Sequence, residues 1–197
     1  YEPFCFHQEG REGIYDEVPP GQESSFFAGM AWDILKESYH AMGYTIHLTV
    51  VSWNGAMTLT DDGKVDIIFP AVKTSEREEK YHFSQELSYP HSHFLVYAPH
   101  KSHIVWNGLA SLDGKTVGVI RGFSYGKIWE EYIKTGTPKL SEYTDVKQGF
   151  LMLERGRLDA VVGYELSYDY LLKQWGWEQK YTRFPPFDES RSFLMGR

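Results

Sequence analysis

The sequence predicts an α/β protein made of two lobes of similar size. Two series of alternating strand-like and helix-like segments lie along the chain, in residues 26–72 and 115–176. A polar stretch without periodicity, residues 97–108, separates the two series. The proline-bearing segment RFPPF at 183–187 follows the second series, and it predicts that the chain returns to the first lobe.

Composition supports a globular chain and narrows its partners. The 197 residues are 42% hydrophobic, which is enough for a sizeable core. The formal net charge of -7 argues against nucleic acid or an anionic membrane as a partner. No apolar run approaches the roughly 20 residues of a membrane helix. The single cysteine, Cys5, excludes an internal disulfide and a thiolate-rich zinc site, and we expect neither a metal nor a cofactor.

The first series begins with a helix in residues 26–43, where apolar residues recur at helical spacing and Gly43 stands at the expected C-terminus. Alternation and β-branched residues predict a strand over 44–53. Residues 54–63 predict a short helix, and the apolar run 64–72 predicts a buried strand. This succession favours a mainly parallel sheet covered by helices.

The second series repeats this order. The sequence predicts a strand at 115–122, a helix at 124–136 opened by Ser124, a mostly helical segment at 141–157, a buried strand at 158–164 and a helix at 166–176.

These two series define the expected domain boundaries. We expect lobe 1 to comprise residues 1–96 and 184–197, and lobe 2 to comprise residues 101–183. Two crossover segments, near residues 95–103 and 183–187, would join the lobes. Clefts between such lobes are common places for small ligands to bind.

One arginine, Arg77, stands among acidic residues soon after an apolar run. The string alone favours an ion pair with Glu76, Glu78 or Glu79, which is the usual state of a surface arginine. A guanidinium also offers a planar fork of donors that matches a carboxylate, and it stays charged when desolvated. Thr74 would begin a short helix whose N–H groups favour an anion.

Four ordered stretches resemble the periplasmic solute-binding proteins of the polar amino-acid type, which serve ABC importers. The stretches are GMAWDIL (29–35), GKVDIIFPAVKTSEREEKYHFS (63–84), LDGKTVGVIRG (112–122) and GRLDAVVGY (156–164). The resemblance rests on their order and spacing, since each string alone is common. It implies a type II periplasmic-binding-protein-like fold, with two α/β lobes joined by two crossover segments. It also implies a cleaved signal peptide, a strand before Tyr1 and helices after Arg197.

The resemblance further implies a function. A protein of this family captures a small carboxylate-bearing or amino-acid-like ligand in the cleft between its lobes. It works outside the cytoplasm, in the periplasm or a comparable compartment, and delivers the ligand to the membrane permease of an ABC importer. We expect this chain to be a monomer and not an enzyme.

The resemblance carries over a first set of site residues in lobe 1. An arginine at the position of Arg77 binds the ligand's α-carboxylate, and Thr74 precedes it at the start of the short helix. Trp53 and Tyr1 align with positions where family members often stack an aromatic ring on the ligand. Trp53 also stands at the end of the strand expected over 44–53, where α/β sheets bind ligands, although core filling would explain it equally well.

Several positions depart from the pattern of amino-acid binders. Val72 replaces a hydroxyl residue, and Tyr164 replaces the aspartate that pairs with the α-ammonium. Phe123 replaces the threonine of a Gly-Thr loop, just before Ser124. Glu165 could substitute for the aspartate if the register shifts by one, although neighbouring strand residues point to opposite faces. The sequence therefore predicts recognition of a carboxylate, and it favours a ligand with a flat or apolar body over an ordinary amino acid.

Two other functions remain open from the sequence. Related dehydratases carry a glutamate where this chain has Ser167, and no carboxylate–histidine spacing marks Glu165, Asp169 or His82 for acid–base work. The same domain also serves as the ligand-sensing domain of membrane receptors, and nothing within the domain separates that use from transport.

Histidines prompt one further check for a metal site. His91 and His93 could share a strand face, with His100 and His103 nearby. Without cysteines or a clustered carboxylate, this group predicts a polar surface rather than a metal site.

Overall fold

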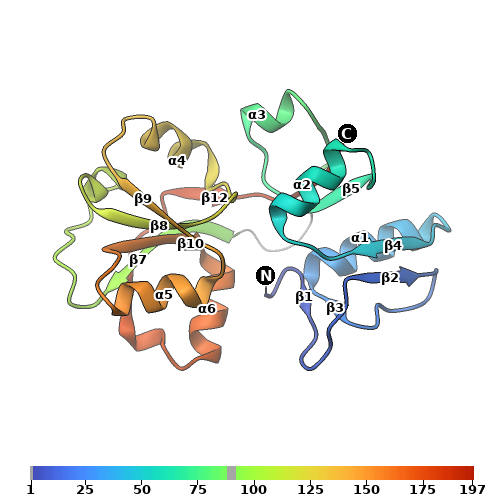
Figure 1. Cartoon of the computed structure of the whole chain (residues 1–197), viewed down its shortest axis with the longest axis horizontal. Coiled ribbons are helices and arrows are strands. Elements are labelled where there is room, and N and C mark those ends of the chain that lie inside the picture. Colours follow the sequence, from blue (N-terminus) through green and yellow to red (C-terminus); the bar gives the residue numbers. More distant parts are fainter. Residues whose placement is uncertain (1, 88–91) are drawn as a thin grey trace. The chain divides into compact units, whose positions relative to one another are not determined.

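The computed structural model describes residues 2–87 and 92–197 (Figure 1). The chain divides into two compact units, with Tyr1–Pro90 and Arg191–Arg197 in unit 1 and His91–Ser190 in unit 2. The expected lobe boundaries near residues 96 and 184 therefore lie several residues from those of the structure. The reason is a strand pairing within unit 2, in which β12 (Asp188–Ser190) runs antiparallel to the start of β7 (Ser92–Pro99).

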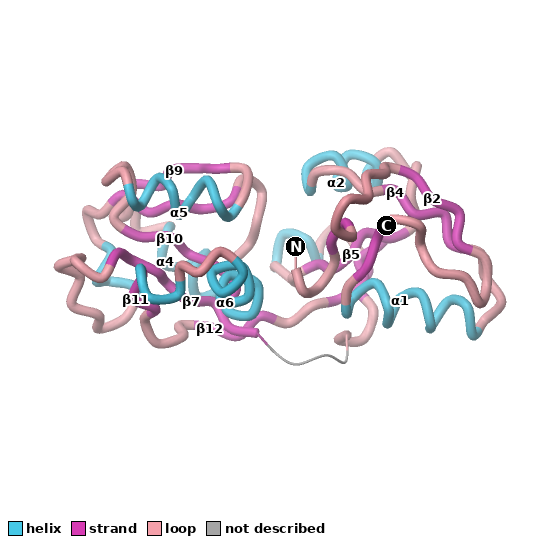
Figure 2. The backbone as a smooth tube through the Cα atoms, turned by 90° about the horizontal axis from the view of Figure 1, so that it is seen from below, coloured by secondary structure: helices cyan, strands magenta, loops and turns pink. Residues whose placement is uncertain are grey.

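The described residues of unit 1 form short strands and three helices. Its elements are β1 (Phe6–His7), β2 (Tyr15–Val18), β3 (Phe27–Ala28), α1 (Met30–Ala41), β4 (Ile46–Thr49), α2 (Trp53–Asp61), β5 (Ile67–Ala71), α3 (Ser75–Glu78), β6 (His82–Phe83) and β13 (Phe193–Gly196). Helices α1 and α2 lie on opposite sides of the strands (Figure 2).

Strand pairing in unit 1 corrects one prediction from the sequence. Among the described residues, the strands form three separate sheets, β1–β3, β2–β4 and β5–β13–β6, and every pair in them is antiparallel. The expected mainly parallel sheet is therefore wrong for this unit. Strands β4 and β5 do follow one another through α2, but each pairs with a different strand that runs in the opposite direction.

The ends of α2 show how local sequence positions the candidate site. The extended segment expected to reach residue 53 stops at Thr49, and Trp53 is the first residue of the helix. The Ser52 side chain accepts a hydrogen bond from the backbone N–H of Gly55 at 3.3 Å, which is a typical N-cap. Helix α2 then packs on β5 through a cluster that includes Met57 and buried Ile68.

Unit 2 is built around one larger sheet. Its elements are β7 (Ser92–Pro99), η1 (Leu109–Leu112), β8 (Thr116–Ile120), α4 (Gly126–Ile133), β9 (Lys139–Tyr143), α5 (Val146–Glu154), β10 (Ala160–Tyr164), α6 (Glu165–Gln174), η2 (Glu178–Lys180), β11 (Tyr181–Arg183) and β12 (Asp188–Ser190).

The sheet of unit 2 has the order β11-β7-β10-β8-β9, and β12 also pairs with β7. Strand β8 runs parallel to β9 and β10, whereas β7 is antiparallel to β10, β11 and β12. Helix α4 lies on one side of the sheet, and α5 and α6 lie on the other (Figure 1). The expected parallel arrangement is thus present from β10 to the edge strand β9 but not at β7.

A strand was missed within the segment 141–157, which the sequence predicts to be mostly helical. The structure places β9 at Lys139–Tyr143 and begins α5 only at Val146. Asp145 separates the two, because its carboxylate accepts a hydrogen bond from the backbone N–H of Gln148 at 3.0 Å and caps the helix. The helix then buries Phe150 completely in the core of unit 2.

Two further observations concern the described residues as a group. None of the helices in residues 2–87 and 92–197 is both long and apolar enough to cross a membrane. Within the same residues, no three histidine, cysteine or acidic side chains come together in a way that could hold a metal ion.

Candidate functional site

The residues that lead to Arg77 form a tight sequence of strand, cap and helix. Strand β5 ends at Ala71, and α3 begins three residues after Val72. The Thr74 hydroxyl accepts a hydrogen bond from the backbone N–H of Arg77 at 3.2 Å, so Thr74 is the N-cap of α3 as the sequence predicts.

Two contacts that hold the Arg77 guanidinium lie among the described residues of unit 1. One Nη atom donates a hydrogen bond to the backbone carbonyl of Val72 at 2.9 Å. The guanidinium carbon lies 4.9 Å from the centre of the Trp53 ring, which is close enough for a cation–π interaction. Val72 and Trp53 thus contact the arginine itself. A guanidinium held in this way is preorganised for a planar anion such as a carboxylate.

The acidic residues beside Arg77 have lysine partners. Glu76 lies 3.5 Å from the ammonium of Lys80, and Glu78 lies 3.9 Å from that of Lys73. Two of the neighbouring glutamates therefore form ion pairs with lysines rather than with Arg77.

The positive charge of Arg77 affects the pKa of Tyr81. The Tyr81 hydroxyl donates a short hydrogen bond to the carboxylate of Asp61, and this bond raises the pKa of the tyrosine. The positive charge of Arg77 acts in the opposite direction, since it stabilises the phenolate. The charge of Arg77 is thus felt by the polar groups around it.

The candidate residues of unit 2 form an aromatic group around Tyr164. The ring of Tyr164 lies edge-on to the rings of Phe94 and Phe123, with centroids 4.9 and 6.0 Å away. Its hydroxyl donates a hydrogen bond to the backbone carbonyl of Ser124 at 2.7 Å. The Tyr164 oxygen is thus positioned by the loop before α4.

Ser124 does not open α4 in the way that the sequence predicts. The helix begins at Gly126, and Tyr125 occupies the N-cap position without a side-chain cap bond. The Ser124 hydroxyl instead donates to the Glu130 carboxylate at 2.7 Å and accepts weakly from the Gly126 N–H at 3.4 Å. Its role in the structure is to tie this loop to the helix.

Asp188, which sequence reasoning missed, lies at the start of the same helix. Its Oδ2 accepts a hydrogen bond from the backbone N–H of Ile128 at 3.3 Å. A Cβ atom at Gly126 would lie 2.6 Å from this oxygen, and Gly126 has a φ of +85°, so glycine is what admits the carboxylate. No sequence signal links Asp188 to a helix about sixty positions earlier, because only the β7–β12 pairing brings them together.

Glu165 belongs to a charged network rather than to an open binding position. Its carboxylate lies 2.6 Å from the His93 Nδ1 and 2.5 Å from an Nη atom of Arg183. Arg183 also pairs with Asp169, whose other oxygen accepts a hydrogen bond from the Tyr97 hydroxyl at 3.0 Å. The suggested role of Glu165 as partner of a ligand ammonium therefore competes with two existing partners, His93 and Arg183.

Burial governs the ionisation of this network. The pKa of Asp169 is raised, because the loss of solvent outweighs the hydrogen bond from Tyr97 and the charge of Arg183. Burial also raises the pKa of Tyr97, with the charge of Asp169 as the next cause. Tyr97 therefore acts as a hydrogen-bond donor at neutral pH.

The site residues predicted from the sequence are divided between the two units. Arg77, Trp53, Val72 and Thr74 lie together in unit 1, and Phe123, Ser124, Tyr164 and Glu165 lie near one another in unit 2. Tyr1 lies outside the described residues, as does His91.

Comparison with known proteins identifies the family. Residues 13–151 match the bacterial extracellular solute-binding proteins, family 3, and this match covers well over half of the chain. The chain therefore belongs to this family, as its sequence motifs predict.

A similar sequence is that of the L-cystine-binding protein TcyJ of Escherichia coli K12. The two are 25% identical over 156 residues, which is 78% of this chain and 56% of that protein. The chain thus spans little more than half of the length of this relative.

Solved structures share the fold over the whole chain. One is holo ArgBP from T. maritima, with a TM-score of 0.77 and 22% identity, covering 100% of this chain and 78% of that one. Another is an ABC uptake transporter substrate-binding protein from Streptococcus pneumoniae with bound histidine, with a TM-score of 0.77, 19% identity, and coverage of 100% and 75%. These matches confirm the predicted type II periplasmic-binding-protein fold.

Proposed function

We propose that this chain is the ligand-binding part of an extracytoplasmic solute-binding protein that serves an ABC importer. In this proposal it captures a small carboxylate-bearing or amino-acid-like molecule and passes it to a membrane permease. Membership of family 3 supports the class of function. The observation that carries the ligand class is the Arg77 guanidinium, held by the Val72 carbonyl and the Trp53 ring.

In this proposal Arg77 binds the carboxylate of the ligand. A guanidinium and a carboxylate form two parallel charge-assisted hydrogen bonds, which fix orientation as well as affinity. Arginine suits this role better than lysine, because it is more weakly hydrated and its fork of donors is planar. TcyJ is described as L-cystine-binding, and solved structures of ArgBP and of the Streptococcus pneumoniae protein are described with bound arginine and bound histidine. Each of these molecules has an α-carboxylate.

The remainder of the ligand is proposed to differ from an ordinary amino acid. Val72 contributes a backbone carbonyl and an aliphatic side chain where a hydroxyl would help to hold an ammonium. Glu165 is paired with His93 and Arg183. An ammonium buried without a carboxylate partner is costly. We therefore favour a carboxylate-bearing ligand with a flat or apolar body, for which the Trp53 ring beside Arg77 would suit stacking.

The proposal also includes the absence of a catalytic role. Ser167, which stands where related dehydratases carry a glutamate, is buried within α6. Glu165 and Asp169 share Arg183 as a partner, which favours a structural ion-pair network over acid–base chemistry.

Thermal-shift screening followed by titration calorimetry tests this function. The twenty standard amino acids, L-cystine, organic acids, aromatic acids and small peptides are screened together, since a ligand of the folded state raises the Tm. For any hit, Arg77→Ala should weaken binding by about 2–5 kcal/mol, which is tens- to thousands-fold. Arg77→Lys should lose less.

Arg11→Ala provides the matched control. Arg11 is an exposed arginine of the same unit, and its guanidinium also donates to a backbone carbonyl, that of Ser25 at 2.8 Å. This variant should bind like the parent. Equal binding by the parent and both Arg77 variants would remove Arg77 from the site, and strong binding of ordinary amino acids alone would overturn the preference for other acids.

A further inference from the structure

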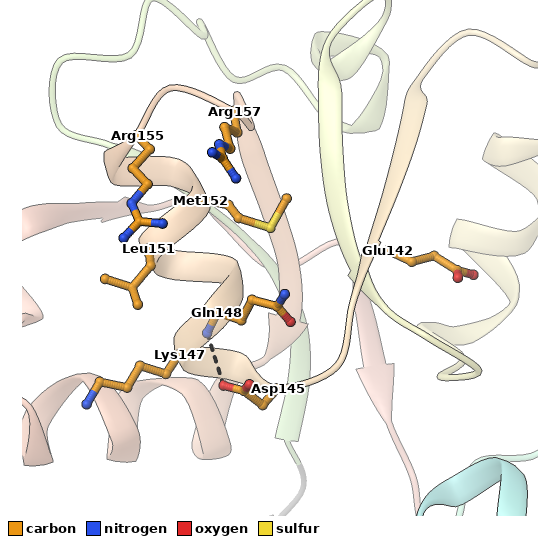
Figure 3. A pocket seen from close by; sticks show the side chains of 8 residues that line it. All are labelled: Glu142, Asp145, Lys147, Gln148, Leu151, Met152, Arg155 and Arg157. Carbon is orange, nitrogen blue, oxygen red and sulfur yellow. Dashed lines mark hydrogen bonds between the residues drawn. The ribbon is translucent and has the colours of Figure 1, made fainter.

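A cationic face lies on unit 2, and none of the residues that define it is among those assigned to ligand binding. It surrounds a surface hollow of about 410 Å³ along α5 and the turn that follows it (Figure 3). We define the α5 face by its three exposed cations, Lys147, Arg155 and Arg157, and by its two partly buried apolar residues, Leu151 and Met152.

Helical spacing explains why these residues share a face. Lys147, Leu151 and Arg155 are four residues apart, so they project from the same side of α5, as Figure 3 shows. Met152 and Arg157 lie next to one another beside this row (Figure 3). The face therefore alternates cations with apolar side chains.

Two carboxylates, Glu142 and Asp145, also line the hollow, and each is engaged with another group. Glu142 points away from α5 (Figure 3) and lies 2.8 Å from the guanidinium of Arg121. Asp145 caps α5, and Glu154 lies 2.7 Å from the ammonium of Lys180.

Among the described residues, no carboxylate lies within ion-pair distance of Lys147, Arg155 or Arg157. Lys147 instead stands over the rings of Trp175 and Trp177, at 5.6 and 5.9 Å from their centres.

Charge is distributed unevenly between the two units. Unit 1 has 15 acidic and 8 basic residues, whereas unit 2 has 12 of each. The net charge of -7 thus lies on unit 1, and an acidic molecule is repelled less by unit 2. The α5 face is a cationic patch on the unit that carries no net charge.

We propose that the α5 face binds an acidic segment of a partner protein. The spacing of the cations argues against a single small anion, because eight residues along a helix separate Lys147 from Arg155 by about 12 Å. An extended chain covers a similar span in three or four residues, so two acidic side chains with an apolar residue between them match the face. Leu151 and Met152 would contact that apolar residue. The proposal does not rest on the identity of the transported ligand.

A labelled peptide tests the proposal on the whole chain. The probe is a fluorescein-labelled peptide of Glu-Leu-Ser repeats, and the comparison probe has glutamine in place of each glutamate. Fluorescence anisotropy at low salt should show that the parent protein binds the glutamate peptide and not the glutamine peptide. Binding should weaken as salt is added, since the contacts are exposed.

Two triple variants separate the face from net charge. Lys147→Glu/Arg155→Glu/Arg157→Glu should weaken binding by about tenfold or more. Lys101→Glu/Lys134→Glu/Lys139→Glu changes the charge equally at three exposed lysines of the same unit, and it should leave binding nearly unchanged. Lys147→Gln/Arg155→Gln/Arg157→Gln should also weaken binding. This variant introduces no negative charge, so it tests the α5 face even if the glutamate variant fails to fold.

Several results would overturn the proposal. These are failure of the parent to bind the glutamate peptide, equal binding of both peptides, or equal losses in the two triple variants. Vesicles of phosphatidylserine and phosphatidylcholine provide the remaining arm. If the parent binds these vesicles through the α5 face but binds neither peptide, the face recognises a lipid surface and not a protein segment.

Discussion

Unit 1 and unit 2 differ in how their strands are connected. In the described residues of unit 1, the strands fall into sheets of two, three and two strands, so side-chain packing must join one sheet to the next. Unit 2 has one hydrogen-bonded sheet that runs from β11 to β9. Backbone hydrogen bonds join every strand of a continuous sheet to a neighbour, so one strand cannot separate without breaking them. We therefore expect unit 2 to unfold more cooperatively than unit 1.

The two units also differ in charge, which affects how a ligand is captured. The candidate anion-binding residue, Arg77, lies in the unit that holds the whole net charge of -7. Long-range attraction therefore does not favour an anionic ligand, and its capture depends on short-range contacts. Trp53 and Val72 hold the Arg77 guanidinium by direct contact, whereas the net negative charge of unit 1 does not attract an anionic ligand to it.

The largest expected effect on stability comes from the core of unit 2. Phe150 is fully buried, and its ring contacts Tyr97, Tyr168 and Tyr181. Phe150→Ala should lower the free energy of unfolding by about 3–5 kcal/mol, because it leaves a cavity in a continuous core. Denaturant titration measures this loss. Phe27→Ala in unit 1 should cost less, since Phe27 lies in a smaller sheet and is 7% exposed; an equal or greater loss would contradict the comparison.

A smaller effect is expected from the charged network of unit 2. Arg183→Met leaves Glu165 and Asp169 without their shared cation, and these carboxylates are only 19% and 32% exposed. We expect a loss of about 1–2 kcal/mol, discounted because the Arg183 side chain is 48% exposed. Thermal denaturation is the measurement. Arg121→Met is the control, since the Arg121–Glu142 pair is more exposed and should contribute under about 0.5 kcal/mol.

Helix caps should contribute equally in the two units. Ser52→Ala removes the N-cap of α2 in unit 1, and Asp145→Ala removes that of α5 in unit 2. Each should lower the free energy of unfolding by about 1 kcal/mol, because capping depends on local backbone groups and not on the sheet. Urea titration of both variants compares them directly. A cap effect confined to one unit would show that tertiary context outweighs this local rule.

The smallest expected effect is a pH dependence at Asp169. Because its pKa is raised above the ordinary value of 3.8, the folded protein binds this proton more tightly than the unfolded chain does. The stabilisation from this proton is fully present below pH 3.8 and is lost as the pH rises through the folded-state pKa. Asp169→Asn cannot titrate, so its stability relative to the parent should increase from acid to neutral pH. Thermal denaturation over that range measures the trend, and a trend of opposite sign would place the pKa below its ordinary value.

The sequence predicted the parts of the molecule that depend on neighbours along the chain. The helices α1, α2, α4, α5 and α6 lie within or close to the predicted segments, as do the buried strands β5, β8 and β10. Thr74 caps α3 as predicted, because an N-cap needs only a hydroxyl and the N–H groups that follow it. The ordered motifs also predicted the family, which the match over residues 13–151 confirms.

Pairing between distant strands could not be predicted in the same way. Strand β9 was included in a helix, since Lys139–Tyr143 is a half-exposed edge strand whose conformation depends on pairing with β8. The boundary of unit 2 moved for a similar reason, because β12 pairs with β7. Hydrogen bonds between such segments are formed only in the folded chain.

The site shows the same division. Sequence by itself predicted that Arg77 follows a threonine N-cap, Thr74. The resemblance to the family predicted that Arg77 and the aromatic residue Trp53 both contact the ligand. Tertiary structure alone decided that its guanidinium contacts Trp53 and the Val72 carbonyl. It also decided that Glu165 is paired with Arg183 and that Asp188 reaches the start of α4. The physical reason is that charge and hydrogen-bond partners act over a few ångströms, and residues far apart in sequence reach that range only after the chain has folded.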